Sequence, residues 1–83
     1  MAQENRIALI SIIVEDREQS GPINTYLHEY SDFIIGRMGI PRPERGISII
    51  SVALDAPQDK ISALSGKLGA LAKVSTKTTY STK

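Results

Sequence analysis

Two segments of this sequence have apolar side chains on both faces of a β-strand, which restricts how so short a chain can fold. They are residues 6–15, RIALISIIVE, and residues 45–55, RGISIISVALD. Neighbouring side chains of a strand point to opposite sides of a sheet, so both sides would carry isoleucine, leucine or valine. With 83 residues, the chain is expected to form one domain with a small core. Other elements of the chain can therefore cover only one side of such strands.

The first helical pattern follows the first of these segments. Its apolar side chains recur at the three- and four-residue intervals of one helix face: Ile23, Tyr26, Leu27 and Tyr30. The start of this helix has two candidate signals. A capping box of Asp16 with Gln19 would start it early, whereas Pro22 suits a first turn that begins near Ser20. We expect the start between Asp16 and Gly21.

A second helix is predicted within residues 55–72, DAPQDKISALSGKLGALA. Its apolar stripe consists of Ile61, Leu64, Leu68 and Leu71. Asp55 and Gln58 form a capping box, and Gly69 offers a C-terminal stop. The run SGKLGAL within it lacks the spacing of a phosphate-binding P-loop. Close packing of the helix at its glycines is therefore the favoured interpretation.

Two further strands complete the pattern, at residues 32–38, DFIIGRM, and residues 74–80, VSTKTTY. The resulting order is β-α-β-β-α-β, which is typical of the ferredoxin-like α+β fold. We predict one such domain over residues 1–83, with a four-stranded antiparallel sheet and two helices on one face. Residues 1–5 are polar and are expected to form a frayed terminus.

One face of this sheet would lack a cover, although its central strands carry aliphatic side chains there. Soluble monomers rarely expose so large an apolar patch, and burying each such side chain contributes about 1.5–3 kcal/mol. We therefore predict a homo-oligomer, formed by sheet faces or by edge strands. The alternative is that termini or loops cover the face, but the chain has few residues to spare. The expected interface residues are Ile7, Leu9, Ile13, Ile40, Ile47 and Ile49.

The stretch IIGRMGIPRPERGISII, residues 34–50, allows two interpretations. Its arginines could converge on a carboxylate or phosphate, helped by backbone N–H groups near Gly39 and Gly46. Alternatively, its prolines and Glu44 belong to a constrained hairpin loop of residues 39–46. We favour the hairpin first and the anion site second. A rigid arm that reaches a neighbouring subunit would also explain an exposed Ile40.

Composition and motifs argue against several classes of protein. The formal net charge of +1 is too small for a typical nucleic-acid-binding surface, and the apolar run of residues 7–14 is too short to span a membrane. There is no cysteine and one histidine, His28, which forms no zinc-protease motif. No catalytic serine lies in a nucleophile elbow. We expect a cytoplasmic, non-enzymatic protein with no metal and no cofactor.

Three segments together resemble a known family, the small regulators of the iron-only hydrogenase system. The segments are IIVEDRE (residues 12–18), IIGRMGIPRPERGISIISVALD (residues 34–55) and ALSGKLGAL (residues 63–71). The resemblance implies an ACT-like fold, related to the C-terminal ligand-binding domain of the nickel-responsive regulator, and assembly as a dimer or tetramer. It further implies a regulatory or sensor role linked to hydrogenase metabolism in anaerobes.

The sequence departs from the relatives of this family in ways that affect the expected ligand. The nickel-responsive domain uses several histidines and a cysteine, which this chain lacks. Amino-acid-binding ACT domains carry a glycine soon after an acidic residue, whereas here Gly21 follows Asp16 at a distance of five residues. We do not expect direct DNA binding, because the predicted elements use the whole chain.

We therefore expect a regulatory module that binds a small molecule, an anion or a protein partner at subunit interfaces. The candidate ligand-binding residues are Glu15, Asp16, Arg17, Arg37, Met38, Arg42 and Arg45. Two other hypotheses remain open. One is a small oligomeric enzyme, for which Ser11, Ser51 or His28 would supply the polar group, and the other is nucleic-acid binding through the arginines.

Overall fold

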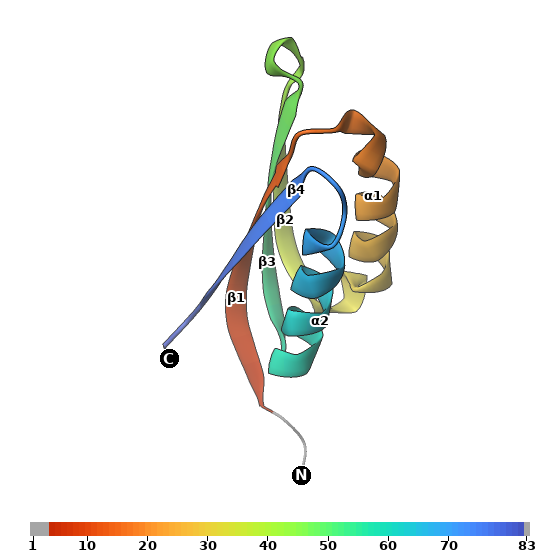
Figure 1. The fold of residues 1–83 in the computed structure, drawn as a ribbon. Coiled ribbons are helices and arrows are strands. Elements are labelled where there is room, and N and C mark those ends of the chain that lie inside the picture. The colour runs from red at the N-terminus through yellow and green to blue at the C-terminus, as the bar shows by residue number, and fades with distance from the viewer. Residues whose placement is uncertain (1–3, 83) are drawn as a thin grey trace.

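Four strands form one antiparallel sheet, and two helices lie against one of its faces (Figure 1). The computed structural model describes residues 4–82. Its strands are β1 (Asn5–Val14), β2 (Ile34–Arg42), β3 (Ile47–Pro57) and β4 (Val74–Tyr80). Its helices are α1 (Ser20–Glu29) and α2 (Gln58–Gly69), with three short 3-10 helices, η1 (Arg17–Gln19), η2 (Ser31–Phe33) and η3 (Pro43–Arg45). The sheet order β2-β3-β1-β4 confirms the predicted ferredoxin-like α+β fold.

The core lies between the helices and the two central strands. In the register of β1 with β3, Ile10 pairs with Val52 and Ile12 with Ile50. The side chains on this face of β1 and β3 meet the apolar stripes of both helices, and the largest fully buried ones are Ile10, Ile12, Ile23, Leu27, Val52, Leu54, Ile61, Leu64 and Leu68. No polar side chain of residues 4–82 is buried. The layer between sheet and helices is therefore an apolar core.

Helix α1 begins at Ser20, within the predicted interval, with Pro22 in its first turn. Asp16 caps the short helix η1 instead, because its Oδ1 accepts a hydrogen bond from the Glu18 N–H at 3.0 Å. The two start signals in the sequence thus serve two consecutive elements. The chain therefore reaches α1 through η1, which begins with Arg17.

The predicted capping box of the second helix is wrong. Strand β3 continues through Asp55, which pairs with Ile7, and α2 begins only at Gln58 without a side-chain cap. The predicted stop at Gly69 is confirmed. A Cβ at Gly69 would lie 3.0 Å from Thr76 Oγ1, so the helix packs closely on β4 there, whereas a Cβ at Gly66 would meet open space. The close-packing interpretation therefore holds for Gly69 and is wrong for Gly66.

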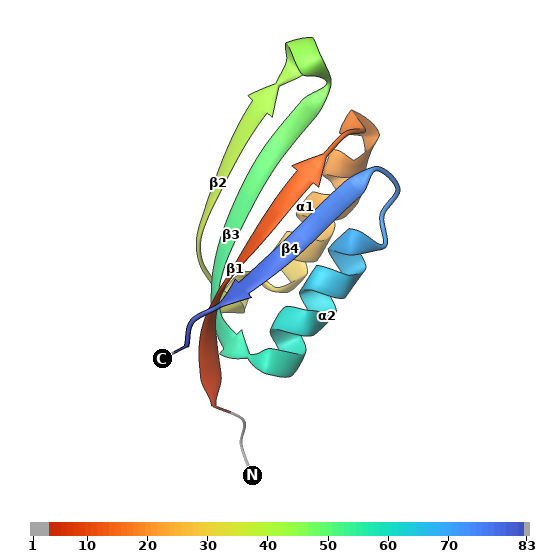
Figure 2. The same ribbon diagram turned by 60° about the vertical axis from the view of Figure 1, so that its left-hand side comes forward.

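The hairpin between β2 and β3 is longer than the sequence predicted. Instead of ending at Met38, β2 continues to Arg42, which pairs with Ile47, so the predicted eight-residue loop shrinks to η3 and Gly46. We call residues 41–48 the arm, because β1 pairs with β3 only as far as Ser48. The arm projects past both helices (Figures 1 and 2) and makes the molecule long, at 47 × 20 × 17 Å.

The structure adds two observations on the predicted ends and on membrane segments. Strand β1 already includes Asn5, where fraying was expected, and residues 1–3 of that predicted terminus lie outside the described residues. Helices α1 and α2 contain ten and twelve residues, and no helix within residues 4–82 is long and apolar enough to cross a membrane.

Candidate functional site

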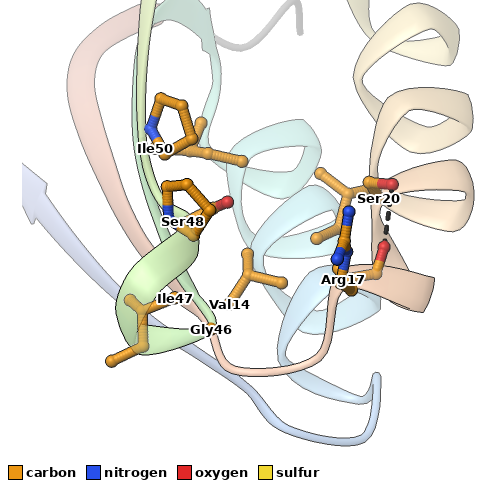
Figure 3. A pocket seen from close by; sticks show the side chains of 10 residues that line it. Val14, Arg17, Ser20, Gly46, Ile47, Ser48 and Ile50 are labelled. Carbon is orange, nitrogen blue, oxygen red and sulfur yellow. Dashed lines mark hydrogen bonds between the residues drawn. The ribbon is translucent and has the colours of Figure 1, made fainter.

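A cavity of about 480 Å³ lies between the arm and the start of α1 (Figure 3). Its apolar floor comes from β1, α1 and β3, through Val14, Ile23 and Ile50. The arm forms the opposite wall, with Pro41, Pro43, Gly46, Ile47 and Ser48. Arg17 and Ser20 complete the lining beside α1, across from Ser48 and Ile50 in Figure 3. Segments distant in the sequence therefore enclose a space of the size that small ligands occupy.

The chemistry of the arm makes it a stiff wall. Pro41 and Pro43 each fix one backbone φ angle, and Gly46 adopts a left-handed conformation with φ 65° that closes the turn. Arg42 Nε lies 2.9 Å from Glu44 Oε1, which forms an ion pair across η3. Pro41 lies on the edge strand of the sheet, the position at which a sheet tolerates proline. The arm thus holds its shape although no helix covers it.

Arg17 is the only charged residue that lines the cavity within the described part of the chain. Its backbone carbonyl accepts a hydrogen bond from Ser20 Oγ at 2.9 Å, which ties η1 to the first turn of α1 (Figure 3). Within residues 4–82 its guanidinium has neither an ion pair nor a hydrogen bond. A cation without a partner at the edge of an apolar cavity can pair with an anionic group of a ligand.

The other predicted ligand residues are distributed over different surfaces. Arg37 lies on the helix-facing side of β2 and donates to Asn24 Oδ1 at 3.3 Å, whereas the next residue, Met38, faces the other side. Arg42 is engaged with Glu44, and Arg45 lies exposed in η3.

The three arginines of the arm stretch do not converge, since the continued strand sends Arg37 and Arg42 to opposite faces. Of the first-loop candidates, Glu15 is exposed, Asp16 caps η1, and Arg17 alone lines the cavity.

The face of the sheet away from the helices is apolar over three strands, and we call it the open face. Register and alternation place the following side chains on it, of which Ile47 also lines the cavity: Ile7, Leu9, Ser11, Ile13, Met38, Ile40, Ile47, Ile49, Ser51 and Ala53. Leu9 is 43% exposed, Ile40 44% and Ile49 38%, although all three are large hydrophobic residues. Ile13, Ile49 and Ile40 form a continuous row across β1, β3 and β2. Of the six predicted interface residues, only Ile13 and Ile47 are partly buried.

None of the residues proposed for an enzyme site lies between the sheet and the helices. Ser11 and Ser51 pair with each other on the open face, and His28 is exposed on α1. Within residues 4–82, no three histidine, cysteine, aspartate or glutamate side chains form a group that could hold a metal ion.

Sequence reasoning missed Ser20, Pro41, Pro43 and Ser48 as parts of a cavity. The paired prolines of GIPRPERG were the one available signal, and they were interpreted as a loop. It also missed a cluster that joins the helices, in which Lys67 Nζ lies 3.1 Å from Glu29 Oε1 and over the rings of Tyr26 and Tyr30. The hydrogen bond to Glu29, and then that to Tyr30, raises the pKa of Lys67 above its usual value.

The sheet order and helix placement define a ferredoxin-like domain with a ligand-sized cavity beside its second hairpin. A family model described as "TM1266-like: Iron-only hydrogenase system regulator, putative" matches residues 6–78. The chain therefore belongs to the TM1266-like family. The resemblance inferred from the sequence is thereby confirmed.

Two solved structures illustrate how far the similarity extends. The uncharacterized protein TM1266 from Thermotoga maritima is 41% identical, with a TM-score of 0.87 over 93% of this chain and 98% of that one. A formyltetrahydrofolate deformylase from Pseudomonas putida KT2440 is 15% identical, with a TM-score of 0.64 over 88% of this chain and 28% of that one. The second likeness shows the fold alone. No curated protein is detectably similar to the chain.

Proposed function

We propose that this chain is a non-enzymatic regulatory module of the iron-only hydrogenase system, acting in the cytoplasm. It would assemble with copies of itself through the open face and bind a small molecule in the cavity beside the arm. Membership of the TM1266-like family supports the regulatory role. The observation that carries the mechanism is that β2 and β3 present cavity residues on one side of the arm and apolar residues of the open face on the other.

A second copy of the chain suits the open face for two reasons. Aliphatic side chains lie on both sides of the central Ser11–Ser51 pair of this face. Within residues 4–82 its charges lie at the margins: by register, Asp55 lies at one end of β3, Arg42 beside the other end, and Lys77 on the edge strand β4. The two copies could be related by a two-fold axis that lies between the two open faces, parallel to the sheets and perpendicular to the strands. This arrangement brings Asp55 of each chain toward Arg42 of the other. Face-to-face packing of two sheets also buries the isoleucine row that the helices leave exposed.

The arm provides a route by which a ligand could influence assembly. Ser48 and Ile50 line the cavity, whereas Ile49 between them belongs to the open face. A ligand that shifts or stiffens these strands on one side changes the surface offered to the second copy on the other. Binding and assembly would then be coupled reciprocally, as linkage requires.

The proposal is tested in the native host by replacing Ile49 with lysine in the chromosomal copy and measuring hydrogenase activity. We expect a change in that activity, because the variant loses assembly while its helix-covered core stays intact. Ala63→Lys, on the exposed surface of α2, is the matched control and should leave hydrogenase activity at the wild-type value. Unchanged activity in Ile49→Lys, with the purified variant shown to be monomeric, would refute a regulatory role that depends on assembly.

A further inference from the structure

We infer that the cavity beside the arm binds a small monocarboxylate with an apolar body, whose carboxylate pairs with Arg17. This inference deepens the proposed function and rests on its premise that the cavity is a ligand site. The volume of about 480 Å³ lies within the range of about 300–1,000 Å³ typical of small-molecule sites.

Two residues of the lining could bind the carboxylate of the ligand. Arg17 offers a planar fork of N–H donors that matches a carboxylate, and it has no competing partner within residues 4–82. On the arm side, the half-buried Ser48 hydroxyl lines the same cavity and is likewise without a hydrogen-bond partner in the described residues. The lining thus offers one guanidinium and one hydroxyl as donors to an anionic group.

The surrounding charges argue against other anions and against amino acids. Arg17 is the one cation of the lining among the described residues, so a second negative charge on the ligand would lose its hydration without a positive partner there. Phosphates and dicarboxylates are therefore disfavoured. Among the described residues, none that lines the cavity carries a carboxylate, so the α-ammonium group of an amino acid would lose its hydration without an ion-pair partner.

The other residues of the lining could contact the hydrocarbon part of the ligand. Val14 and Ile23 form a buried floor, and the rings of Pro41 and Pro43 stand opposite, so a branched or short linear hydrocarbon chain would replace water there. Each methylene buried on binding raises affinity about fourfold. Affinity should therefore rise along a series of carboxylates until the cavity is filled, and then fall.

The test measures binding to the purified full-length protein by calorimetry, with amide NMR shifts of Gly46 and Ser48 to locate the ligand. The probes are acetate, butyrate, hexanoate and 4-methylpentanoate. Leucine differs from 4-methylpentanoate only by its amino group, 4-methylpentanamide is an uncharged analogue of nearly the same shape, and inorganic phosphate represents polyanions. We expect 4-methylpentanoate to bind at least tenfold more tightly than leucine, the amide or phosphate, and affinity to rise from acetate to hexanoate.

Variants assign the carboxylate contact. Arg17→Gln should lower the affinity for 4-methylpentanoate at least tenfold. The melting temperature of this variant without ligand should equal that of the wild-type protein. Arg45 is an exposed arginine of the arm that does not line the cavity, and Arg45→Gln should leave the affinity unchanged. Equal affinity in wild type and Arg17→Gln would overturn the inference.

The two proposals fail in different ways. If leucine or phosphate binds more tightly than the carboxylates and shifts the Gly46 and Ser48 amides, only the ligand class is wrong. If these probes and a broad metabolite set all leave both amides unshifted, the cavity is not a ligand site. That result overturns both the inference and the sensing part of the proposed function.

Discussion

Ser48 and Ile49 are neighbours in β3 whose side chains lie on opposite faces of the sheet. Ser48 lines the cavity beside the arm, and Ile49 is 38% exposed on the open face, paired with Ile40 of β2 and Ile13 of β1. The two-residue period of a strand therefore places the candidate ligand surface and the candidate assembly surface one residue apart. A change in the backbone of β3 on the cavity side therefore also moves the side chains of the open face.

The open face yields a prediction about assembly in solution. Leu9→Lys should turn an oligomer into a monomer of 9.0 kDa at micromolar concentration, because a charge in the apolar interface loses its hydration without a partner. Sedimentation velocity measures the change, with wild type expected above that mass. Ala63→Lys adds the same charge on the outer surface of α2 and should sediment like wild type. A wild-type chain that is itself monomeric would contradict assembly through the open face.

The turn of the arm yields a prediction about backbone strain. Gly46 has φ 65°, so Gly46→Ala should lower the free energy of unfolding by about 1–2 kcal/mol. Asparagine tolerates this conformation better, and Gly46→Asn should lose less stability than Gly46→Ala. Urea denaturation followed by circular dichroism gives both values. Equal stability of the alanine variant and wild type would mean that the turn can relax without cost.

The two glycines of α2 form a matched pair for testing helix packing. Gly66→Ala places its methyl group in open space and should raise the free energy of unfolding by about 0.5–1 kcal/mol, through better helix propensity. Gly69→Ala places its methyl group 3.0 Å from Thr76 Oγ1, so the Thr76 side chain must give way by a few tenths of an ångström. We expect Gly69→Ala to be less stable than Gly66→Ala by thermal unfolding. The reverse order would contradict close packing of α2 on β4.

The Lys67 cluster yields a pH-dependent prediction. The hydrogen bond to Glu29, and secondly that to Tyr30, raises the pKa of Lys67 above 10.5, so protonation of Lys67 favours the folded state. This contribution is complete below pH 10.5 and is lost as the pH rises through the raised pKa. Lys67→Met should therefore melt at a lower temperature than wild type at pH 8, and the difference should shrink above pH 10.5.

The control for this experiment is Lys60→Met. Lys60 lies exposed on the same helix and has no ion pair within residues 4–82, so its removal should change the melting temperature little at either pH. A melting difference for Lys67→Met that stays constant from pH 8 to pH 11 would show that the tyrosine packing of its hydrocarbon chain, and not its charge, is what stabilises the helix pair.

The sequence by itself determined the helices and strands in which apolar residues recur at a regular spacing. The periodicities of the two helices and the four strands predicted the order β-α-β-β-α-β and hence the ferredoxin-like fold, because apolar side chains recur at the period of each element. It also singled out Arg17 as a candidate ligand residue, and the structure places it on the cavity. The open face followed from the same alternation, since two helices cover one side of a sheet.

Only the tertiary structure decided the features that depend on pairing between distant segments. Asp55 has the local signature of a helix cap, yet it belongs to β3 because the backbone of β1 extends alongside it at Ile7. Prolines and charges made residues 39–42 resemble a loop, yet pairing with β3 makes them a strand. The cavity exists because the extended arm stands over the start of α1. Hydrogen-bond ladders and enclosed volumes are relations between segments, so no local pattern of residues encodes them.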